Sequence, residues 1–290
     1  MKLFGSRTAS KETPAGHVGD GAAGTPPDVD AQAMAEMTFL EHLEELRWAL
    51  FKGIGGILLT TLICFAFSDF IIEQVLMGPK ESDFITFRLL GLEIESFELQ
   101  NRSVTGQFFA WIGMIMAAGF VLGSPFFVFA LWKFIEPGLY PNERKGLRFS
   151  AVFATGFFML GIAFGYFVIT PFALKFFAEF ELSPEVINEF DITKYASMVT
   201  FWSLGAGALF ELPVVIYFLS KLGVVTAAMM RKWRKFGLLI TLILGSIFTP
   251  PDPFTMILVA IPLMGLYELS ILISAYSERK RDREMKAALE

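Results

Sequence analysis

Carboxylates cluster at the start of the first long helical pattern in the sequence, within Met37–Lys52. Glu41, Glu44 and Glu45 are close together there, and Arg47 follows them. An ionised carboxylate only accepts hydrogen bonds, and it suits bidentate pairing with a planar guanidinium group. The cluster therefore indicates a docking site for a cationic partner.

Glu143 is a second carboxylate candidate, after the second apolar segment of the chain. A structural interpretation is available, because Asn142 can cap a helix whose first turn contains Glu143, where the macrodipole favours negative charge. The functional interpretation is that Glu143 and Glu45 together bind two guanidinium groups. The residue types are compatible with both interpretations.

Glu211 lies inside an apolar segment, ten residues before Lys221. At ~1.5 Å per helical residue it would be roughly 15 Å inside a membrane-spanning helix. A carboxyl group at that depth costs at least ~2.5 kcal/mol, which makes it a functional candidate by default. Pro213 frees backbone carbonyls one turn upstream and adds local polarity. The structural alternative is a protonated, hydrogen-bonded carboxyl that holds helices together.

Two further acidic residues are better explained by local structure than by function. Asp252 directly precedes Pro253, and Asp at the N-cap with Pro at the first helical position is a preferred helix start. Glu268 lies near the end of the last apolar segment, where we expect snorkelling or a helix–helix hydrogen bond.

The sequence gives no indication of catalysis. Cys64 is the single cysteine, and His17 and His42 are the only histidines, which excludes an intramolecular disulfide and Cys- or His-rich metal sites. Nucleotide-binding loops and Gly-x-Ser-x-Gly are also absent. We therefore expect no enzymatic activity, no metal, no cofactor and no nucleic-acid partner.

The composition indicates an all-α polytopic membrane protein. Apolar residues make up 54% of the chain, 33 residues are Phe, and the mean hydropathy is +0.56. A soluble chain of this length would need a more charged surface. The net charge of -5 says little alone, because the distribution of charge along a membrane protein matters more than its sum.

Six apolar segments predict six transmembrane helices. Thr38 and Glu41 have capping-box spacing, so the first helix should begin near Phe39 and project some two turns beyond the membrane. Gly161-x-x-x-Gly165 permits close helix approach. The segments lie at about 48–68, 107–131, 148–171, 195–220, 235–248 and 254–273.

The last two of these helices are predicted to be short. Phe236–Phe248 offers about 20 Å of helix before the Thr249–Pro253 break. A short hairpin of the fifth and sixth helices would leave the bilayer locally thinned. The long stretch 69–106 is partly apolar, and we expect it to form a periplasmic cap of short helical and irregular pieces.

The basic residues predict that both termini are cytoplasmic. Five of them lie in the segments on one side of the predicted helices, and the other 19 lie on the opposite side, which the positive-inside rule assigns to the cytoplasm. The first five are Lys80, Arg88, Arg102, Lys175 and Lys194.

The predicted domain organisation has three parts. Residues 1–36 lack apolar periodicity and the apolar core of a signal peptide, so we expect a disordered cytoplasmic tail. Residues 37–277 form the six-helix membrane domain. Residues 278–290 form a charged cytoplasmic tail that touches anionic lipid.

Taken together, an ordered series of motifs resembles the TatC family, the core membrane subunit of the twin-arginine protein translocase. The resemblance covers about 37–277. Its motifs are Phe39-Leu-Glu-His-Leu-Glu-Glu-Leu-Arg47, Phe134-Ile-x-Pro-x-Leu-Tyr140-x-x-Glu143-Arg144, Phe210-Glu211-Leu-Pro213, Thr249-Pro-Pro-Asp252 and Ala260-Ile-Pro262.

The resemblance implies a receptor in the cell inner membrane for twin-arginine signal peptides of folded precursors. Such a receptor forms homo- and hetero-oligomers and gathers single-span TatA and TatB partners for transport driven by the proton-motive force. By the same resemblance, Glu45 and Glu143 contact the arginine pair, and Arg47, Phe134 and Arg144 shape that face. Glu211 faces the concave side of the bundle, where partner helices or the signal pass. Pro79 and Asp252 belong to functionally sensitive outer segments.

Two other functions stay open at this point. A proton-coupled small-solute transporter would use Glu211 as its proton relay and would need no partner. A purely structural membrane scaffold would tolerate replacement of Glu45, Glu143 and Glu211. The two halves of the chain do not look like inverted copies, which disfavours many secondary transporters.

Overall fold

The computed structural model describes residues 39–92, 94, 97–135, 141–249 and 252–287 of the 290-residue chain. The chain divides into two compact units, Met1–His42 and Leu43–Glu290. The described part of the first unit is residues 39–42, which begin helix α2 (Phe39–Ala66) as the capping-box pattern predicts. Thr38 and the side chains of Glu41 and His42 lie outside the described residues.

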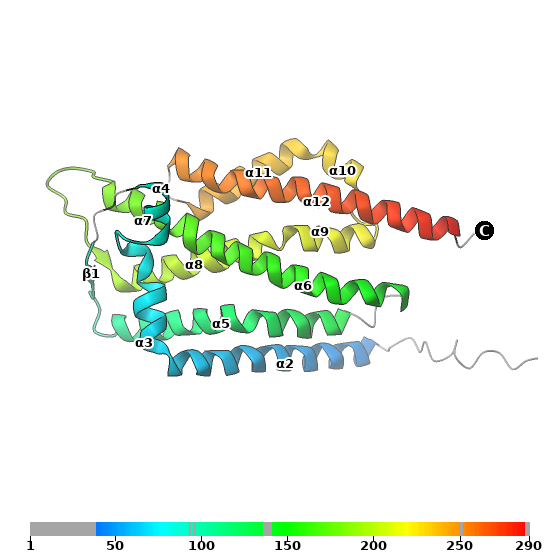
Figure 1. Ribbon diagram of the computed structural model, residues 1–290, viewed down its shortest axis with the longest axis horizontal. Helices are drawn as coiled ribbons and strands as arrows, with labels where there is room; N and C mark the ends of the chain where they lie inside the picture. The colour runs from blue at the N-terminus through cyan, green and yellow to red at the C-terminus, as the bar shows by residue number, and fades with distance from the viewer. Residues whose placement is uncertain (1–38, 93, 95–96, 136–140, 250–251, 288–290) are drawn as a thin grey trace, which may run out of the picture. The chain divides into compact units, whose positions relative to one another are not determined.

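Long apolar helices make up most of the second unit and lie side by side (Figure 1). After α2 come α5 (Gly106–Ile135), α6 (Pro141–Phe164), α8 (Ile192–Phe210), α9 (Leu212–Lys221), α11 (Arg234–Phe248) and α12 (Pro253–Ala287). Shorter helices are α7 (Thr170–Glu179), which continues α6 through the π-helix η4 (Gly165–Ile169), and α10 (Ala227–Lys232).

Five stretches in the described part of the chain are long and apolar enough to cross a membrane. They are Leu43–Ala66, Gly106–Leu131, Ala151–Glu179, Ile192–Lys221 and Pro253–Arg279. These agree with five of the six predicted segments, and the protein is a multi-pass membrane protein. The fifth predicted segment is α11, whose 15 residues confirm that it is short. That α11 also spans the bilayer stays a prediction.

The sixth helix is not short, so that prediction is wrong. Helix α12 has 35 residues and continues from the apolar segment to Ala287. Residues 278–287 are Glu, Arg, Lys, Asp, Met and Ala, without Gly or Pro, and most of these are good helix formers that let the helix continue past the apolar segment. The charged run ends the hydropathy signal but does not end the helix.

Small residues bring the helices into close contact. A Cβ atom added to Gly161 would lie 2.8 Å from Cα of Gly207, and one added to Gly165 would lie 2.7 Å from Cα of Ser203. The predicted close approach at the Gly161-x-x-x-Gly165 motif is therefore confirmed, and its partner is α8. Buried residues of α2, α5, α7, α8 and α12 and of the π-helical turns 71–76 and 165–169 form one apolar core, and partly buried Phe157 and Phe164 of α6 pack against it.

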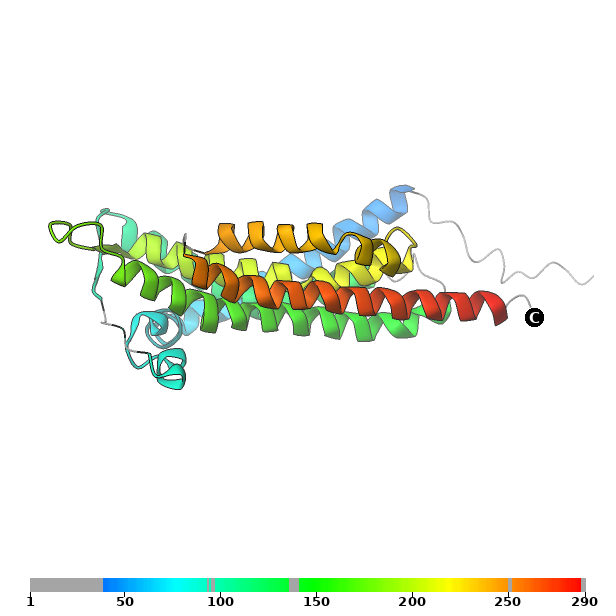
Figure 2. The ribbon, with the colours of Figure 1, turned by 90° about the horizontal axis from the view of Figure 1, so that it is seen from above.

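A cap of short elements lies at one end of the helices. It contains α3 (Ser68–Phe70), the π-helix η1 (Ile71–Leu76), the 3-10 helix η2 (Gly78–Lys80) and α4 (Ile85–Leu90). Strand β1 (Leu99–Gln100) pairs in parallel with β2 (Phe190–Asp191), joining two loops far apart in sequence. Figure 2 shows the short helices of this segment beside the ends of the long ones. The sequence predicted the short helical pieces but not the strand pair.

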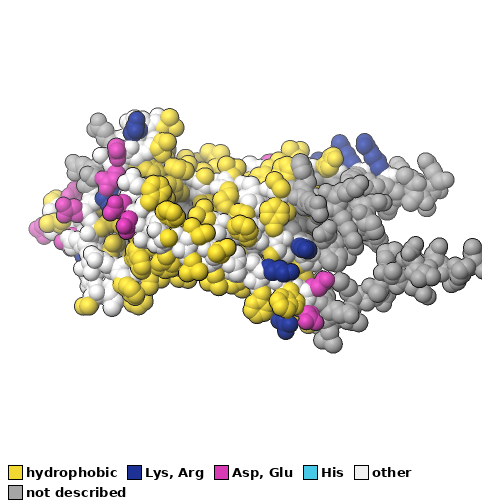
Figure 3. Space-filling view, turned by 60° about the horizontal axis from the view of Figure 1, so that its bottom comes forward, with side chains coloured by type: hydrophobic (Ala, Val, Ile, Leu, Met, Phe, Trp, Pro, Cys, Tyr) yellow, Lys and Arg dark blue, Asp and Glu magenta, His cyan; other side chains and the backbone are white. Residues whose placement is uncertain are grey.

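Many exposed acidic side chains lie at the cap. Figure 3 shows yellow apolar side chains along the helices and several magenta carboxylates at the cap end, with a few more at the opposite end. Exposed carboxylates there are Asp69, Glu73, Asp83, Glu98, Glu179, Glu181, Glu185 and Glu189. The opposite end, where α5 and α9 finish and α6 begins, is called the basic end below because Lys133, Lys221 and the basic residues of α10 lie there.

Candidate functional site

Glu45 lies on the face of α2 that packs against α5. Residues 45, 49, 53, 56 and 60 share one face at helical spacing. On that face a Cβ on Gly53 would lie 3.2 Å from Cα of Phe127, and Thr60 Oγ1 donates to the carbonyl of Gly119 at 2.7 Å. The Glu45 side chain is half-buried, and its Oε2 atom is buried with no hydrogen-bond partner among the described residues.

Glu44 and Arg47 differ from Glu45 in their surroundings. Arg47 Nη2 lies 3.4 Å from Glu44 Oε1, and both side chains are more than half exposed. The Arg47 guanidinium also lies 5.8 Å from the ring centre of Trp48, within the range of a cation–π contact. Arg47 is therefore engaged with its own helix neighbours, while the adjacent Glu45 carboxylate keeps an unused acceptor.

The register of the helices places Glu45 level with the end of α5. Helices α2 and α5 run antiparallel, with residue 53 beside 127, 57 beside 123 and 61 beside 119. Extending this pairing toward the start of α2 brings residue 45 level with Ile135. Phe134, in the last turn of α5, is half-buried.

Glu143 is expected at the same level as Glu45, although its side chain and that of Arg144 lie outside the described residues. Both residues belong to the first turn of α6. The rings of Phe120 and Phe158 are 6.3 Å apart across α5 and α6. Glu143 is fifteen residues before Phe158 on α6, and Ile135 is fifteen residues after Phe120 on α5. Helical rise therefore brings Glu143 level with Ile135, and so with Glu45.

Glu211 lies at a break in the fourth apolar segment. It separates α8 from α9, with φ -74° and ψ -10°. The cause is Pro213, which has no N–H to donate to the carbonyl of Leu209 and is completely buried. The Glu211 backbone carbonyl accepts from Val214 N and Val215 N, both at 3.0 Å, so the chain resumes as a helix at once.

The Glu211 carboxyl has a buried oxygen inside this membrane-spanning segment. The side chain is half-buried, and its Oε1 atom has no hydrogen-bond partner among the described residues. The antiparallel pairing of α6 and α8 puts Thr155 within about one turn of Glu211 in height. Thr155 Oγ1 is also buried without a described partner. The alternative of a hydrogen-bonded structural carboxyl is therefore not supported within the described residues.

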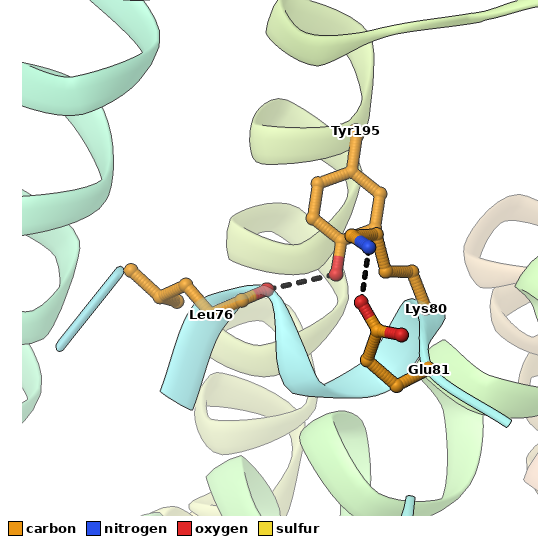
Figure 4. Close-up of polar contacts among 4 residues, drawn as sticks. All are labelled: Leu76, Lys80, Glu81 and Tyr195. Carbon is orange, nitrogen blue, oxygen red and sulfur yellow. Dashed lines mark hydrogen bonds and ion pairs between the residues drawn. The ribbon is translucent and has the colours of Figure 1, made fainter. Parts of the chain in front are cut away.

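Pro79 occupies a buried turn of the cap that is fixed to α8. It lies in η2 and is completely buried. Tyr195 of α8 donates from its hydroxyl to the carbonyl of Leu76 at 2.8 Å, and Lys80 pairs with Glu81 on the same turn (Figure 4). Pro79 is therefore surrounded by contacts that hold this turn of the cap in place.

Asp252 and Glu268 have the structural contacts that local sequence predicts. Asp252 Oδ2 accepts from Thr255 N at 2.8 Å, which confirms its place as the N-cap of α12. Glu268 Oε2 accepts from Arg234 Nη2 at 2.7 Å, which confirms a helix–helix hydrogen bond between α12 and α11.

The sequence did not predict three residues that fix the cap or the start of α8. Asp191 Oδ1 caps α8 by accepting from Thr193 N at 2.9 Å and Lys194 N at 3.1 Å. Tyr195 and Thr86 anchor the cap, Thr86 by donating to the carbonyl of Phe167. The Asp191-Ile-Thr sequence before an apolar run is a capping signal that could have identified the first of them.

Clefts in the cap contain none of the predicted site residues. One of about 850 Å³ lies between residues 82–94 and 178–188, and another of about 590 Å³ lies beside the start of α8. The candidate binding residues are instead at the basic end and at the break between α8 and α9.

Comparisons with known proteins agree with this arrangement. The family model "Sec-independent protein translocase protein (TatC)" matches residues 41–262. A Sec-independent protein translocase protein TatC from Blattabacterium is 38% identical over 260 residues, covering 85% of this chain and 98% of the relative. The TatC protein of Aquifex aeolicus is 33% identical, covering 87% of this chain and 100% of its own length.

Solved structures show the same relationship. The crystal structure of a twin-arginine translocase receptor TatC matches with a TM-score of 0.64 and 32% identity, covering 82% of this chain and 100% of that chain. A second crystal structure of that receptor, in the detergent DDM, matches with a TM-score of 0.66 and 33% identity, covering 81% and 99%.

Proposed function

Because this chain belongs to the TatC family and is a subunit of the Sec-independent protein translocase, we propose that it is the receptor for twin-arginine signal peptides of folded precursors. The observation that supports this most directly is the Glu45 carboxylate. Its Oε2 atom is buried beside the end of α5 and has no hydrogen-bond partner in the described part of the chain. A guanidinium group would provide the missing donors with the geometry that a carboxylate prefers.

Glu143 supplies the second carboxylate in this proposal. Its position in the first turn of α6, level with Glu45, allows one arginine of the pair to reach each carboxylate. Phe134 contributes apolar surface between them, and Arg47 and Arg144 limit which cations can enter by repelling additional positive charge. This arrangement requires binding and positioning but no catalytic step.

The arginine pair cannot account for tight binding alone. A solvent-exposed ion pair contributes only ~0–1 kcal/mol, so the apolar part of the signal must add contacts along the membrane-spanning helices. Exposed apolar side chains are available on α2 and α5, including Leu58, Leu62 and Phe126. The charged contacts then serve to select the signal, and the apolar contacts hold it.

Site-specific photocrosslinking from positions 45 and 143 tests this proposal. A precursor with Arg-Arg should crosslink at both positions, and a Lys-Lys version should lose the crosslinks. Glu45→Gln should weaken binding of the Arg-Arg precursor by up to about fivefold, most strongly at low salt. Equal labelling by both precursors, or by neither, would contradict a receptor that reads guanidinium pairs.

Glu44→Gln is the matched control for Glu45→Gln. It removes the same charge one residue away, from a carboxylate that is exposed and paired with Arg47. Precursor binding should change little. If both variants weaken binding equally, the effect comes from net negative charge at this end of α2, and the specific role of Glu45 fails.

For the remainder of the transport cycle, we propose that Glu211 receives partner helices or the inserted signal. Its buried oxygen and the nearby Thr155 hydroxyl provide hydrogen-bonding capacity inside the membrane span.

The partners are single-span TatA- and TatB-like proteins, and the assembly contains several copies of this chain. Transport is driven by the proton-motive force across the cell inner membrane, with both chain termini in the cytoplasm, as the basic residues predict.

A proton-coupled solute transporter is the competing proposal. It is favoured by the Glu211 carboxyl, which has an oxygen inside a span with no hydrogen-bond partner among the residues that the structure describes. Uptake of solute by the purified protein alone in vesicles, lost on Glu211→Gln, would favour it. A structural scaffold would instead tolerate Gln at positions 45, 143 and 211 together.

A further inference from the structure

The junction between the end of α10 and the start of α11 carries an exposed basic cluster of Arg231, Lys232 and Lys235. Arg234 lies among them but already pairs with Glu268 of α12 at 2.7 Å. The three others are exposed and have no ion-pair partner in the part of the chain that the structure describes. The cluster therefore presents three available positive charges within five residues.

The backbone that carries these charges is held firmly against α12. Tyr267 donates from its hydroxyl to the carbonyl of Met230 at 2.9 Å, and the Ala227 amide donates to Glu278 Oε1 at 2.7 Å. Ala227 and Met230 pack with Ile271 in a small buried cluster. This anchoring lowers the conformational entropy that the cluster would lose on binding a ligand.

An exposed apolar face continues directly from the basic cluster along α11. Phe236, Ile240, Ile243 and Ile247 are spaced on one side of the helix, and each is about half exposed. Trp233 is also half exposed, and its ring centre lies 4.9 Å from that of Phe236. Tryptophan beside basic residues at the end of an apolar helix is typical of the boundary between lipid headgroups and acyl chains.

Helix α11 is too short to cross a full hydrocarbon layer. Its 15 residues span ~22 Å, against ~30 Å of hydrocarbon. It lies at the edge of the bundle beside α12 in both ribbon views (Figures 1 and 2). Since α11 is predicted to span the bilayer, we expect lipid beside it to thin, which would draw headgroups toward the first turn of the helix.

We propose that this surface binds an anionic membrane phospholipid. The phosphate pairs with Arg231, Lys232 and Lys235, and the acyl chains lie along Phe236, Ile240 and Ile243. Charge complementarity selects an anionic headgroup over a zwitterionic one. The proposal depends on the multi-pass membrane character of the chain and is independent of the proposed receptor function.

Native mass spectrometry of the full chain in detergent, with added phosphatidylglycerol or phosphatidylcholine, tests the proposal. The protein should retain phosphatidylglycerol preferentially. The triple variant Arg231→Gln, Lys232→Gln, Lys235→Gln should lose roughly tenfold or more in apparent affinity for it, since each basic residue near a membrane surface contributes appreciably. Affinity for phosphatidylcholine should not change.

Two control proteins make the outcome unambiguous. Lys52→Gln, Arg88→Gln, Lys194→Gln removes the same charge from other exposed positions and should keep the preference. Arg231→Lys, Lys232→Arg, Lys235→Arg keeps the charge and should also keep it, which guards against loss through misfolding. Equal retention of both lipids by the unaltered protein, or an equal loss in both charge-removing variants, would overturn the proposal.

Discussion

Glu44 and Glu45 are adjacent in the sequence, but their carboxylates have different surroundings on α2. Glu44 is exposed and pairs with Arg47, whereas Glu45 faces α5 and has a buried oxygen without a partner in the part of the chain described here by the structure. The difference arises from helical geometry, since consecutive residues point about 100° apart. A binding function proposed for the cluster therefore belongs to Glu45 rather than to the summed charge of the helix start.

Asp191 provides a prediction about pH at the residue scale. Partial burial raises the pKa of its carboxyl, but the backbone amides of Lys194, Arg102 and Thr193 outweigh this, so the net pKa lies below the ordinary value. A carboxyl with a lowered folded-state pKa stabilises the fold above its unfolded pKa of ~3.9, and this contribution disappears as pH falls through the folded-state pKa.

We therefore expect the start of α8 to open more readily as acid is added below about pH 4. Hydrogen exchange of the Thr193 and Lys194 amides measures this opening. Asp191→Asn retains a capping oxygen without a titrating charge, so its exchange should depend less on pH. An identical pH profile in this variant would show that another group is responsible.

At the residue scale, the sequence predicted contacts between residues that are close together in the chain. Asp252 caps α12 through Thr255, three residues away, and local capping rules were sufficient to predict it. Tyr195 and Thr86 bond to carbonyls 119 and 81 residues away. Those pairings depend on how the cap folds over the helices, which local rules do not determine.

Glycine packing provides a prediction at the element scale. A Cβ on Gly165 would lie 2.4 Å from the carbonyl oxygen of Trp202 and 2.7 Å from Cα of Ser203, both backbone atoms that cannot move aside alone. Gly165→Ala, at the start of η4, should therefore force η4 and α8 apart and cost about 1–3 kcal/mol of stability. Thermal unfolding in detergent measures this loss.

Gly156→Ala is the matched control, on α6, which η4 directly continues. A Cβ at Gly156 meets nothing within 4 Å, and alanine favours a helix over glycine by up to about 1 kcal/mol. This variant should be neutral or slightly more stable. Equal destabilisation by the two substitutions would mean that close contact with α8 is not the reason for glycine at position 165.

The elements themselves were predicted to different degrees. Hydropathy located five of the long helices because a lipid-facing helix must be apolar along its length. It did not predict that α12 continues to Ala287, because helix propensity and membrane depth are separate properties. Nor did it predict the pairing of β1 with β2, which are far apart in sequence and only two residues long.

At the scale of the whole second unit, the two ends of the helices differ in charge. The cap end is acidic and held by side chains that bond to distant backbone carbonyls. The basic end contains Glu45 and the start of α6, with Arg231 and its neighbours on α10 and α11. A cationic signal would thus be attracted to one carboxylate site within a largely basic surface, which adds selectivity to affinity.

Glu211 lies inside a membrane-spanning segment, away from the basic end. Its substitution tests the proposed role of this residue in assembly with partner proteins. Glu211→Gln keeps the size of the side chain and removes its charge. We expect precursor crosslinking at positions 45 and 143 to persist, because those residues lie at the basic end rather than at the α8–α9 break. Transport and co-purification of single-span partners should fall.

Ser203→Ala is the appropriate comparison for that variant. Ser203 is also buried on α8 with an oxygen that lacks a described partner, but it carries no charge and should be replaceable. If Glu211→Gln transports normally and retains its partners, a role of Glu211 in assembly is wrong. If it also loses precursor binding at positions 45 and 143, then Glu211 acts in recognition itself, and the division between a surface receptor and an interior assembly site would have to be abandoned.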